Sequence, residues 1–200
     1  MLRVGLTGGL ACGKSFVGEA LAGYGCLLIQ ADVIGHTVLA RNGPAYDQVV
    51  AEFGGGILDG EGEIDRRVLA AEVFGYPERL ERLNQIVHPH VIRKEEELLA
   101  EFAAREPRGV AVVEAAILIE TGGYKRFNKI ILVTCAEEQQ IERAMRRGAA
   151  REDVIARLNR QLPLAEKRKY ADFVIDTSGA KEHTLEQTRA VYEALRRIES

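Results

Sequence analysis

The fold of this chain is decided by the stretch Gly8-Gly9-Leu10-Ala11-Cys12-Gly13-Lys14-Ser15. It fits the pattern G-x-x-x-x-G-K-[ST], a glycine-rich loop whose backbone N–H groups cradle phosphates. The apolar run Val4-Gly5-Leu6-Thr7 before it predicts a short buried strand, and residues 16–24 after it predict a helix. Loop N–H groups and the positive end of that helix attract anionic oxygens. We therefore predict a nucleotide site at this junction.

The residues of the loop have separate expected roles. Gly8 and Gly13 permit backbone turns that a Cβ would obstruct. Lys14 is expected to reach the β- and γ-phosphates, and the Ser15 hydroxyl to bind Mg²⁺. Cys12 lies beside the positive end of the helix, which favours its thiolate and predicts sensitivity to oxidation. The alternative is that Cys12 is only a small side chain that the loop tolerates.

The composition excludes several classes of protein. A net charge of −3 provides no basic field for nucleic acid or a membrane surface, so neither partner is expected. No apolar run approaches the roughly 20 residues of a membrane span, and residues 1–8 are expected to form a strand, not a targeting segment. Cys12, Cys26 and Cys135 lack C-x-x-C spacing, which indicates a cytoplasmic protein without a disulfide framework or zinc site. The oligomeric state stays open.

Short apolar runs alternate with helical patterns along the rest of the chain. The alternation predicts an α/β fold, with a five-stranded parallel sheet flanked by helices. After the first strand, four more are expected at 26–29, 110–113, 129–133 and 173–176, with helices at 33–53, 65–106, 137–147, 152–162 and 184–198.

Several local features refine the expected helices. Asn42-Gly43-Pro44 predicts a turn within 33–53, and Asp65 is expected to cap the helix that follows it. A break is also expected at His88-Pro89, because the residue before a proline avoids the α region. Glu95-Glu96-Glu97 is interpreted as a solvated helix face.

We interpret residues 1–200 as a single domain. Its core is expected at 1–59, 109–136 and 169–200, with a helical insertion at 60–108 and a lid at 137–168. Between positions 143 and 169, nine basic residues stand among three acidic ones: Arg143, Arg146, Arg147, Arg151, Arg157, Arg160, Lys167, Arg168 and Lys169. A cationic lid suits phosphoryl transfer, which spreads negative charge over the transferred group. For any single arginine, a solvated helix face is the alternative.

Two carboxylates follow predicted strands, at the sheet edge where open α/β sheets bind ligands. Asp32 follows the second strand and is the candidate base that accepts the proton of an acceptor hydroxyl. A helix N-cap is a compatible alternative for this residue. Glu114 ends the third strand and is expected to support a metal, the alternative being a carboxylate that faces solvent. His88-Pro89-His90 admits catalytic, ligand-binding and structural roles.

A phosphate loop alone does not distinguish kinases, GTPases and ATPases. Asn128-Lys129-Ile130-Ile131 lacks the aspartate of the N-K-x-D sequence that reads guanine. The short chain and its basic segment favour a small-molecule kinase. Another small kinase acting on a nucleoside monophosphate and a non-catalytic nucleotide switch are the alternatives.

The chain resembles the dephospho-CoA kinase family over nearly its whole length. Besides the phosphate loop and Ala31-Asp32, the segments that carry this resemblance are Ile64-Asp65-Arg66, Val73-Phe74, Leu83-Asn84-Gln85-Ile86-Val87-His88-Pro89, residues 161–167 and residues 171–176. The resemblance implies an enzyme that moves the γ-phosphate of Mg-ATP to the ribose 3′-hydroxyl of dephospho-CoA. That reaction is the final step of coenzyme A biosynthesis.

The resemblance also implies roles for individual residues. Catalysis is assigned to Asp32, Lys14, Arg143 and Arg147. ATP binding is assigned to Gly8, Gly9, Ala11, Cys12, Gly13, Lys14, Ser15, Phe16 and Arg157, and Mg²⁺ binding to Ser15. Dephospho-CoA binding is assigned to Asp32, Arg66 and His88.

The chain departs from the family pattern at four places. Gln30 stands for the first aspartate of Asp-Ala-Asp, and Ala11-Cys12 stands for Gly-Ser. Phe16 replaces a threonine, and Glu114 replaces a shorter aspartate. We expect these changes to alter nucleotide affinity while the fold is kept.

Overall fold

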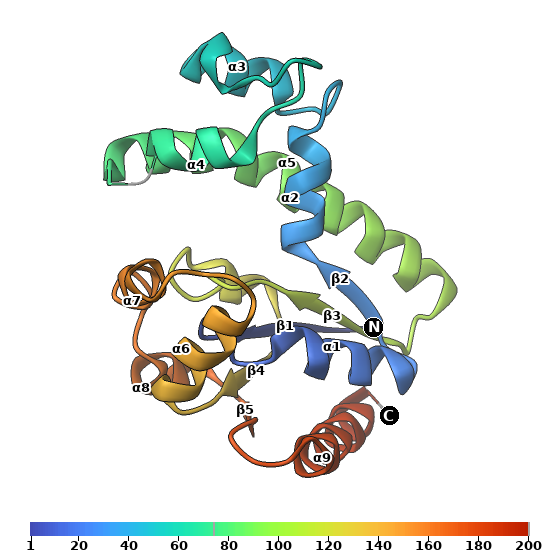
Figure 1. The fold of residues 1–200 in the computed structure, drawn as a ribbon. Helices are drawn as coiled ribbons and strands as arrows, with labels where there is room; N and C mark the ends of the chain where they lie inside the picture. The colour runs from blue at the N-terminus through green and yellow to red at the C-terminus, as the bar shows by residue number, and fades with distance from the viewer. Residues whose placement is uncertain (74, 200) are drawn as a thin grey trace. The chain divides into compact units, whose positions relative to one another are not determined.

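The computed structural model describes residues 1–73 and 75–199, so Phe74, in one segment of the resemblance, lies outside the described residues. Its sheet has five parallel strands in the order β2-β3-β1-β4-β5 (Figure 1). The strands are β1 (Leu2–Gly8), β2 (Leu27–Gln30), β3 (Val110–Glu114), β4 (Lys129–Thr134) and β5 (Phe173–Asp176). The predicted five-stranded parallel sheet flanked by helices is confirmed.

The central strand β1 lies between β3 and β4. Its Leu6 is opposite Glu114 of β3 and Ile131 of β4, and both leucine and isoleucine are completely buried. Continuous apolar runs suit such strands, because both faces of a parallel sheet are covered. Since all strands run in the same direction, their carboxyl ends meet at one edge, where β3 and β4 end at Glu114 and Thr134.

Two helices pack against this sheet and against each other: α1 (Lys14–Gly23) and α9 (Lys181–Glu199) (Figure 1). Leu21 of α1 and Leu195 of α9 are completely buried in the same core cluster. The short α1 begins directly after the phosphate loop, so its position on the sheet fixes the position of the loop.

The chain forms two compact units, residues 1–30 with 100–200 and residues 31–99. Besides the sheet, α1 and α9, the first unit contains α6 (Glu137–Arg146), α7 (Arg151–Leu158), α8 (Leu164–Lys167) and the short turns η2 (Gly123–Arg126) and η3 (Arg168–Tyr170). The helix expected over 152–162 therefore ends earlier, at Leu158.

The second unit is helical. It contains α2 (Ala31–Leu39), α3 (Tyr46–Phe53), η1 (Gly55–Ile57), α4 (Arg66–Val73) and most of α5 (Pro77–Arg105). The turn predicted at 42–44 separates α2 from α3. Asp65 caps α4 as expected, because its Oδ1 accepts the N–H groups of Arg67 and Val68 at 2.8 and 3.3 Å.

The break expected at Pro89 is wrong, because α5 continues through this residue from Pro77 to Arg105. Proline removes one helical donor and crowds the preceding turn. Burial of Ile86 before it and Val91 after it holds both halves of the helix in place.

The interpretation of Glu95 as solvated is also wrong, since this residue is only 4% exposed. Val91 and Leu99 lie four residues to either side, so the three residues share one buried helix stripe. No helix in residues 1–73 and 75–199 has the length and apolar character needed to cross a membrane.

Candidate active site

The loop between β1 and α1 has the shape that its glycines predict. Gly13 has φ 85°, in the left-handed region, immediately before α1. A Cβ on Gly8 would approach the Val133 carbonyl oxygen to 2.3 Å, so any side chain is excluded there. Ala11 is also left-handed, with φ 54°. An L-residue other than glycine pays roughly 1–2 kcal/mol for this conformation, so the alanine strains the loop.

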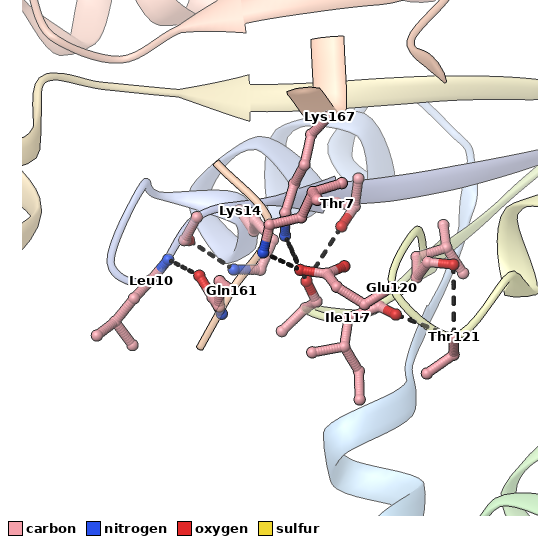
Figure 2. A network of polar contacts seen from close by, with 12 residues as sticks. Thr7, Leu10, Lys14, Ile117, Glu120, Thr121, Gln161 and Lys167 are labelled. Carbon is pink, nitrogen blue, oxygen red and sulfur yellow. Dashed lines mark hydrogen bonds and ion pairs between the residues drawn. The ribbon is translucent and has the colours of Figure 1, made fainter. Parts of the chain in front are cut away.

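Two side chains of the first unit form hydrogen bonds with the backbone of the loop (Figure 2). Lys14 folds back so that its Nζ donates a hydrogen bond to the Gly9 carbonyl at 3.0 Å. The Leu10 N–H donates to Oε1 of Gln161 at 3.0 Å. The Lys14 ammonium thus lies against the loop itself, where it can meet an anion that the loop holds.

Glu114 organises the carboxyl edge of the sheet beside this loop. Its Oε1 accepts a hydrogen bond from the Ser15 hydroxyl at 2.8 Å, and its Oε2 accepts one from Nε2 of Gln30 at 3.1 Å. Glu114 is only 9% exposed, so the alternative of a solvent-facing carboxylate is wrong. At Gln30, where the family has aspartate, the amide donates to Glu114, a hydrogen bond that an ionised aspartate cannot donate.

The oxygen ligands at this edge fit a magnesium ion. The described residues contain no cluster of three or more histidine, cysteine, aspartate or glutamate side chains able to hold a metal. Magnesium at a nucleotide site needs no such cluster, because it takes one or two protein oxygens and completes its shell with phosphates and water. The Ser15 hydroxyl and the neighbouring Glu114 carboxylate supply oxygens of this kind.

Arg143 of α6 is bound to the segment after β5. Its two terminal nitrogens donate to the hydroxyl and the carbonyl of Thr177 at 2.9 and 2.6 Å. The Thr177 hydroxyl donates in turn to the Cys12 carbonyl at 2.8 Å, so a charged side chain supports the back of the loop. No sequence pattern marks Thr177 as part of the site. Arg147 and Arg157 are exposed near the ends of α6 and α7.

Lys167 does not present its charge to solvent as the basic segment predicts. Its side chain is completely buried, and its Nζ pairs with Oε1 of Glu120 at 2.7 Å (Figure 2). The same ammonium donates to the Ala116 carbonyl at 3.2 Å, which also accepts the Thr7 hydroxyl at 3.3 Å. Lys167 is therefore a structural residue that anchors the segment after α7 to the segment that follows β3.

The three residues predicted to bind the acceptor substrate lie in the second unit. Asp32 is exposed in the first turn of α2, two residues along the chain from Gln30, so it lies within the helix and not before it. Arg66 is exposed at the start of α4. His88 is half-buried in α5, and this burial lowers the pKa of its imidazole below the ordinary value of 6.5. This shift favours the neutral form of the ring.

A cavity of about 300 Å³ in the second unit was not anticipated from the sequence. Its lining includes apolar Ile34 and Val38 of α2, together with His90, Arg93 and Lys94 of α5. Basic residues on an exposed helix give no sequence signal of a pocket, because most of them simply interact with water.

Comparison with known proteins gives consistent matches over the whole chain. A family model described as dephospho-CoA kinase matches residues 2–182. The dephospho-CoA kinase of Aquifex aeolicus is 42% identical over 197 residues, which cover 98% of this chain and 99% of that protein. A solved structure from Thermus thermophilus is 34% identical with a TM-score of 0.82, covering 96% of both chains. A solved dephospho-CoA kinase from Campylobacter jejuni is 27% identical with a TM-score of 0.72, covering 99% of this chain and 98% of that one.

Proposed function

The chain belongs to the dephospho-CoA kinase family, and we propose here how its own residues carry out the reaction of that family. The enzyme transfers the γ-phosphate of ATP to the ribose 3′-hydroxyl of dephospho-CoA, the final step of coenzyme A biosynthesis. The observation that carries this function is the glycine-shaped phosphate loop in a chain that matches the family from residue 2 to residue 182.

We assign the triphosphate to the loop Gly8–Ser15. Its N–H groups and the amino end of α1 bind phosphate oxygens. When ATP binds, the Lys14 ammonium gives up its hydrogen bond to the Gly9 carbonyl and contacts the γ-phosphate instead. Phe16 lies in the first turn of α1, where its ring centroid is 5.8 Å from the Lys181 ammonium, and it offers no hydroxyl to a phosphate.

Ser15 and Glu114 are the residues that would hold Mg²⁺ with the nucleotide. Their hydroxyl and carboxylate already lie 2.8 Å apart, and Gln30 keeps the carboxylate oriented. When bound, Mg²⁺ would neutralise negative charge on the phosphates of the nucleotide. The carboxylate of Glu114 is one methylene longer than the family aspartate, and Gln30 fixes its second oxygen.

We propose that Asp32 is the general base. Its carboxylate takes the proton of the ribose 3′-hydroxyl while that oxygen attacks the γ-phosphorus. The bond from the γ-phosphorus to the β–γ bridging oxygen breaks, and ADP leaves with the charge of that oxygen. The exposure of Asp32 and its place just beyond β2 support this role.

The remaining predicted residues fall into two groups. We propose that Arg143, Arg147 and Arg157 belong to a lid over residues 137–168, with Arg143 acting through Thr177 and the loop. Arg66 and His88 are assigned to dephospho-CoA, in an acceptor region over residues 60–108. The cavity beside Arg93 and Lys94 also includes Glu97, which pairs with Lys94 at 3.1 Å, so we assign it no charge preference toward this acceptor. We also propose a cytoplasmic enzyme, because all three cysteines are free thiols.

The Asp32→Asn variant tests the assigned base. Its amide cannot accept the proton, so we expect turnover with dephospho-CoA to fall about 10²- to 10⁴-fold, with little change in the KM for ATP. Steady-state release of ADP, measured against both substrates, separates these two quantities.

Asp47→Asn is the matched control for this experiment. Asp47 is exposed in the first turn of α3, as Asp32 is in the first turn of α2. Both substitutions remove one acid from a helix amino end, so the control reproduces any loss of helix stability. Near-wild-type turnover of Asp32→Asn with dephospho-CoA rules Asp32 out as the base.

A further inference from the structure

Two cysteine thiols meet beneath the phosphate loop. Cys135, just after β4, donates a hydrogen bond from its Sγ to Sγ of Cys12 at 3.5 Å. Cys12 is completely buried and Cys135 is 7% exposed. Cys12 stands where the family has serine, so this pairing is a property of this chain. In the described part of the chain no sulfur contact is found for the third cysteine, Cys26.

The two thiols differ in acidity, and the more acidic one supplies the thiolate that reacts with an oxidant. The pKa of Cys12 is lowered to about 7, chiefly by the hydrogen bond from Cys135 and also by the Lys14 ammonium, against the opposing effect of burial. The same hydrogen bond and burial raise the pKa of Cys135. The thiolate is the nucleophile in sulfur oxidation, so Cys12 supplies the attacking sulfur and Cys135 the resolving one.

A cavity lies beside this pair of thiols. Cys135, Gly9 and Gln140 line one cavity of about 370 Å³ within the first unit. A Cβ on Gly9 would lie 2.9 Å from Sγ of Cys12, so the Gly9 backbone, which lines the cavity, lies directly against this buried sulfur. Oε1 of Gln140 is buried without a hydrogen-bond partner in the described part of the chain. That oxygen favours a small polar molecule that can donate a hydrogen bond, such as hydrogen peroxide.

We propose that Cys12 and Cys135 are a site of reversible oxidation, where a hydroperoxide converts the two thiols into a disulfide that impairs ATP binding. The Cys12 thiolate attacks one peroxide oxygen, the O–O bond breaks, and the departing hydroxide takes a proton to become water. Cys135 then attacks the sulfur of the sulfenic acid, the S–O bond breaks, and the second hydroxide leaves as water with the Cys135 proton. Two thiols and one hydrogen peroxide give one disulfide and two waters, with two electrons passing to the peroxide.

The effect on activity follows from the distance that the sulfur atoms must close. A disulfide bond measures about 2.05 Å, so the atoms must approach from their present separation by roughly 1.5 Å. Cys12 carries this displacement into the loop that we assign to ATP, where a shift of about 1 Å lowers rate by about 10²-fold. This half of the proposal rests on the proposed role of the loop, whereas disulfide formation does not.

The test is oxidation of the purified protein with hydrogen peroxide, read by peptide mass spectrometry and by turnover of ATP with dephospho-CoA. We expect a peptide pair linked through Cys12 and Cys135, and a fall in free thiols from the three of the reduced protein to one. Activity should fall about 10²-fold together with the appearance of the linked peptides, and dithiothreitol should restore it. Circular dichroism of the oxidised protein should match that of the reduced protein.

Cys135→Ser and Cys26→Ser form the control pair. Cys135→Ser should keep the basal activity of the wild type but should no longer be reversibly inactivated by peroxide. Cys135→Ala is a second variant for the case that the serine disturbs folding. Cys26 has no thiol partner among the described residues, and burial raises its pKa to about 12, so Cys26→Ser should oxidise like the wild type. The proposal is overturned if no Cys12–Cys135 peptide forms, or if the disulfide forms while activity stays unchanged. An inactive reduced protein would instead contradict the proposed function.

Discussion

Replacing Lys14 with methionine is expected to lower kcat/KM for phosphoryl transfer by about a thousandfold. The side chain keeps its length but loses the ammonium that neutralises charge on the γ-phosphate in the transition state. In the structure this ammonium already lies against the loop, donating to the Gly9 carbonyl at 3.0 Å. The loss should appear mainly in kcat, because the transferred group gains contacts to the lysine as its bond to ADP breaks. Steady-state kinetics with ATP and dephospho-CoA measure both constants.

Lys169→Met serves as the control for this variant. Lys169 is exposed and pairs with Glu166 at 2.6 Å on the surface, where such pairs contribute about 0–1 kcal/mol. This variant should have wild-type kinetics and an almost unchanged Tm. A Lys14→Met enzyme within tenfold of the wild type would show that the loop binds nucleotide without contributing to its chemistry.

The Lys167→Met substitution is expected to cause a large loss of folding stability. This substitution removes the ammonium that pairs with Glu120 at 2.7 Å and leaves that carboxylate, only 20% exposed, without its counterion. Breaking a buried ion pair from one side costs about 3–5 kcal/mol. For a chain of this size the cost lowers Tm by about 10 °C, which calorimetry measures directly. Lys169→Met is again the control, since it loses a lysine from an exposed pair.

A double variant distinguishes the pair from simple packing. In Lys167→Met with Glu120→Leu, no charge stays buried, so part of the lost stability should return. The return is incomplete because Oε1 of Glu120 also accepts the Leu162 N–H at 3.2 Å. If the two substitutions add without any recovery, Lys167 contributes through packing and not through its charge.

Local patterns were sufficient to predict the sheet and the phosphate loop. The glycine positions, the strand before them and the helix after them are adjacent in the sequence. One short segment is therefore sufficient to predict this strand–loop–helix unit. Gly13 adopts the left-handed conformation for which the pattern selects glycine. The five apolar runs likewise reflect burial on both faces of a parallel sheet, a property that each strand shows by itself.

The partners within the site could not be predicted in this way. Ser15 and Glu114 are 99 positions apart, and Cys12 and Cys135 are 123 apart, so no local pattern connects them. The burial of Lys167 also has no sequence signal, because its basic neighbours are exposed. Two local interpretations in α5, the break at Pro89 and the solvated Glu95, were wrong because packing of this helix overrides the local pattern.

The most direct test of the proposed reaction measures ADP and phosphorylated product together, with purified enzyme, Mg-ATP and dephospho-CoA. We expect ADP and the 3′-phosphorylated product to form in equal amounts, and no ADP beyond background when the acceptor is omitted. A panel of nucleoside monophosphates should leave ADP at that background. ADP release at the same rate without dephospho-CoA, or faster release with a nucleoside monophosphate, would contradict the assignment of dephospho-CoA as the acceptor.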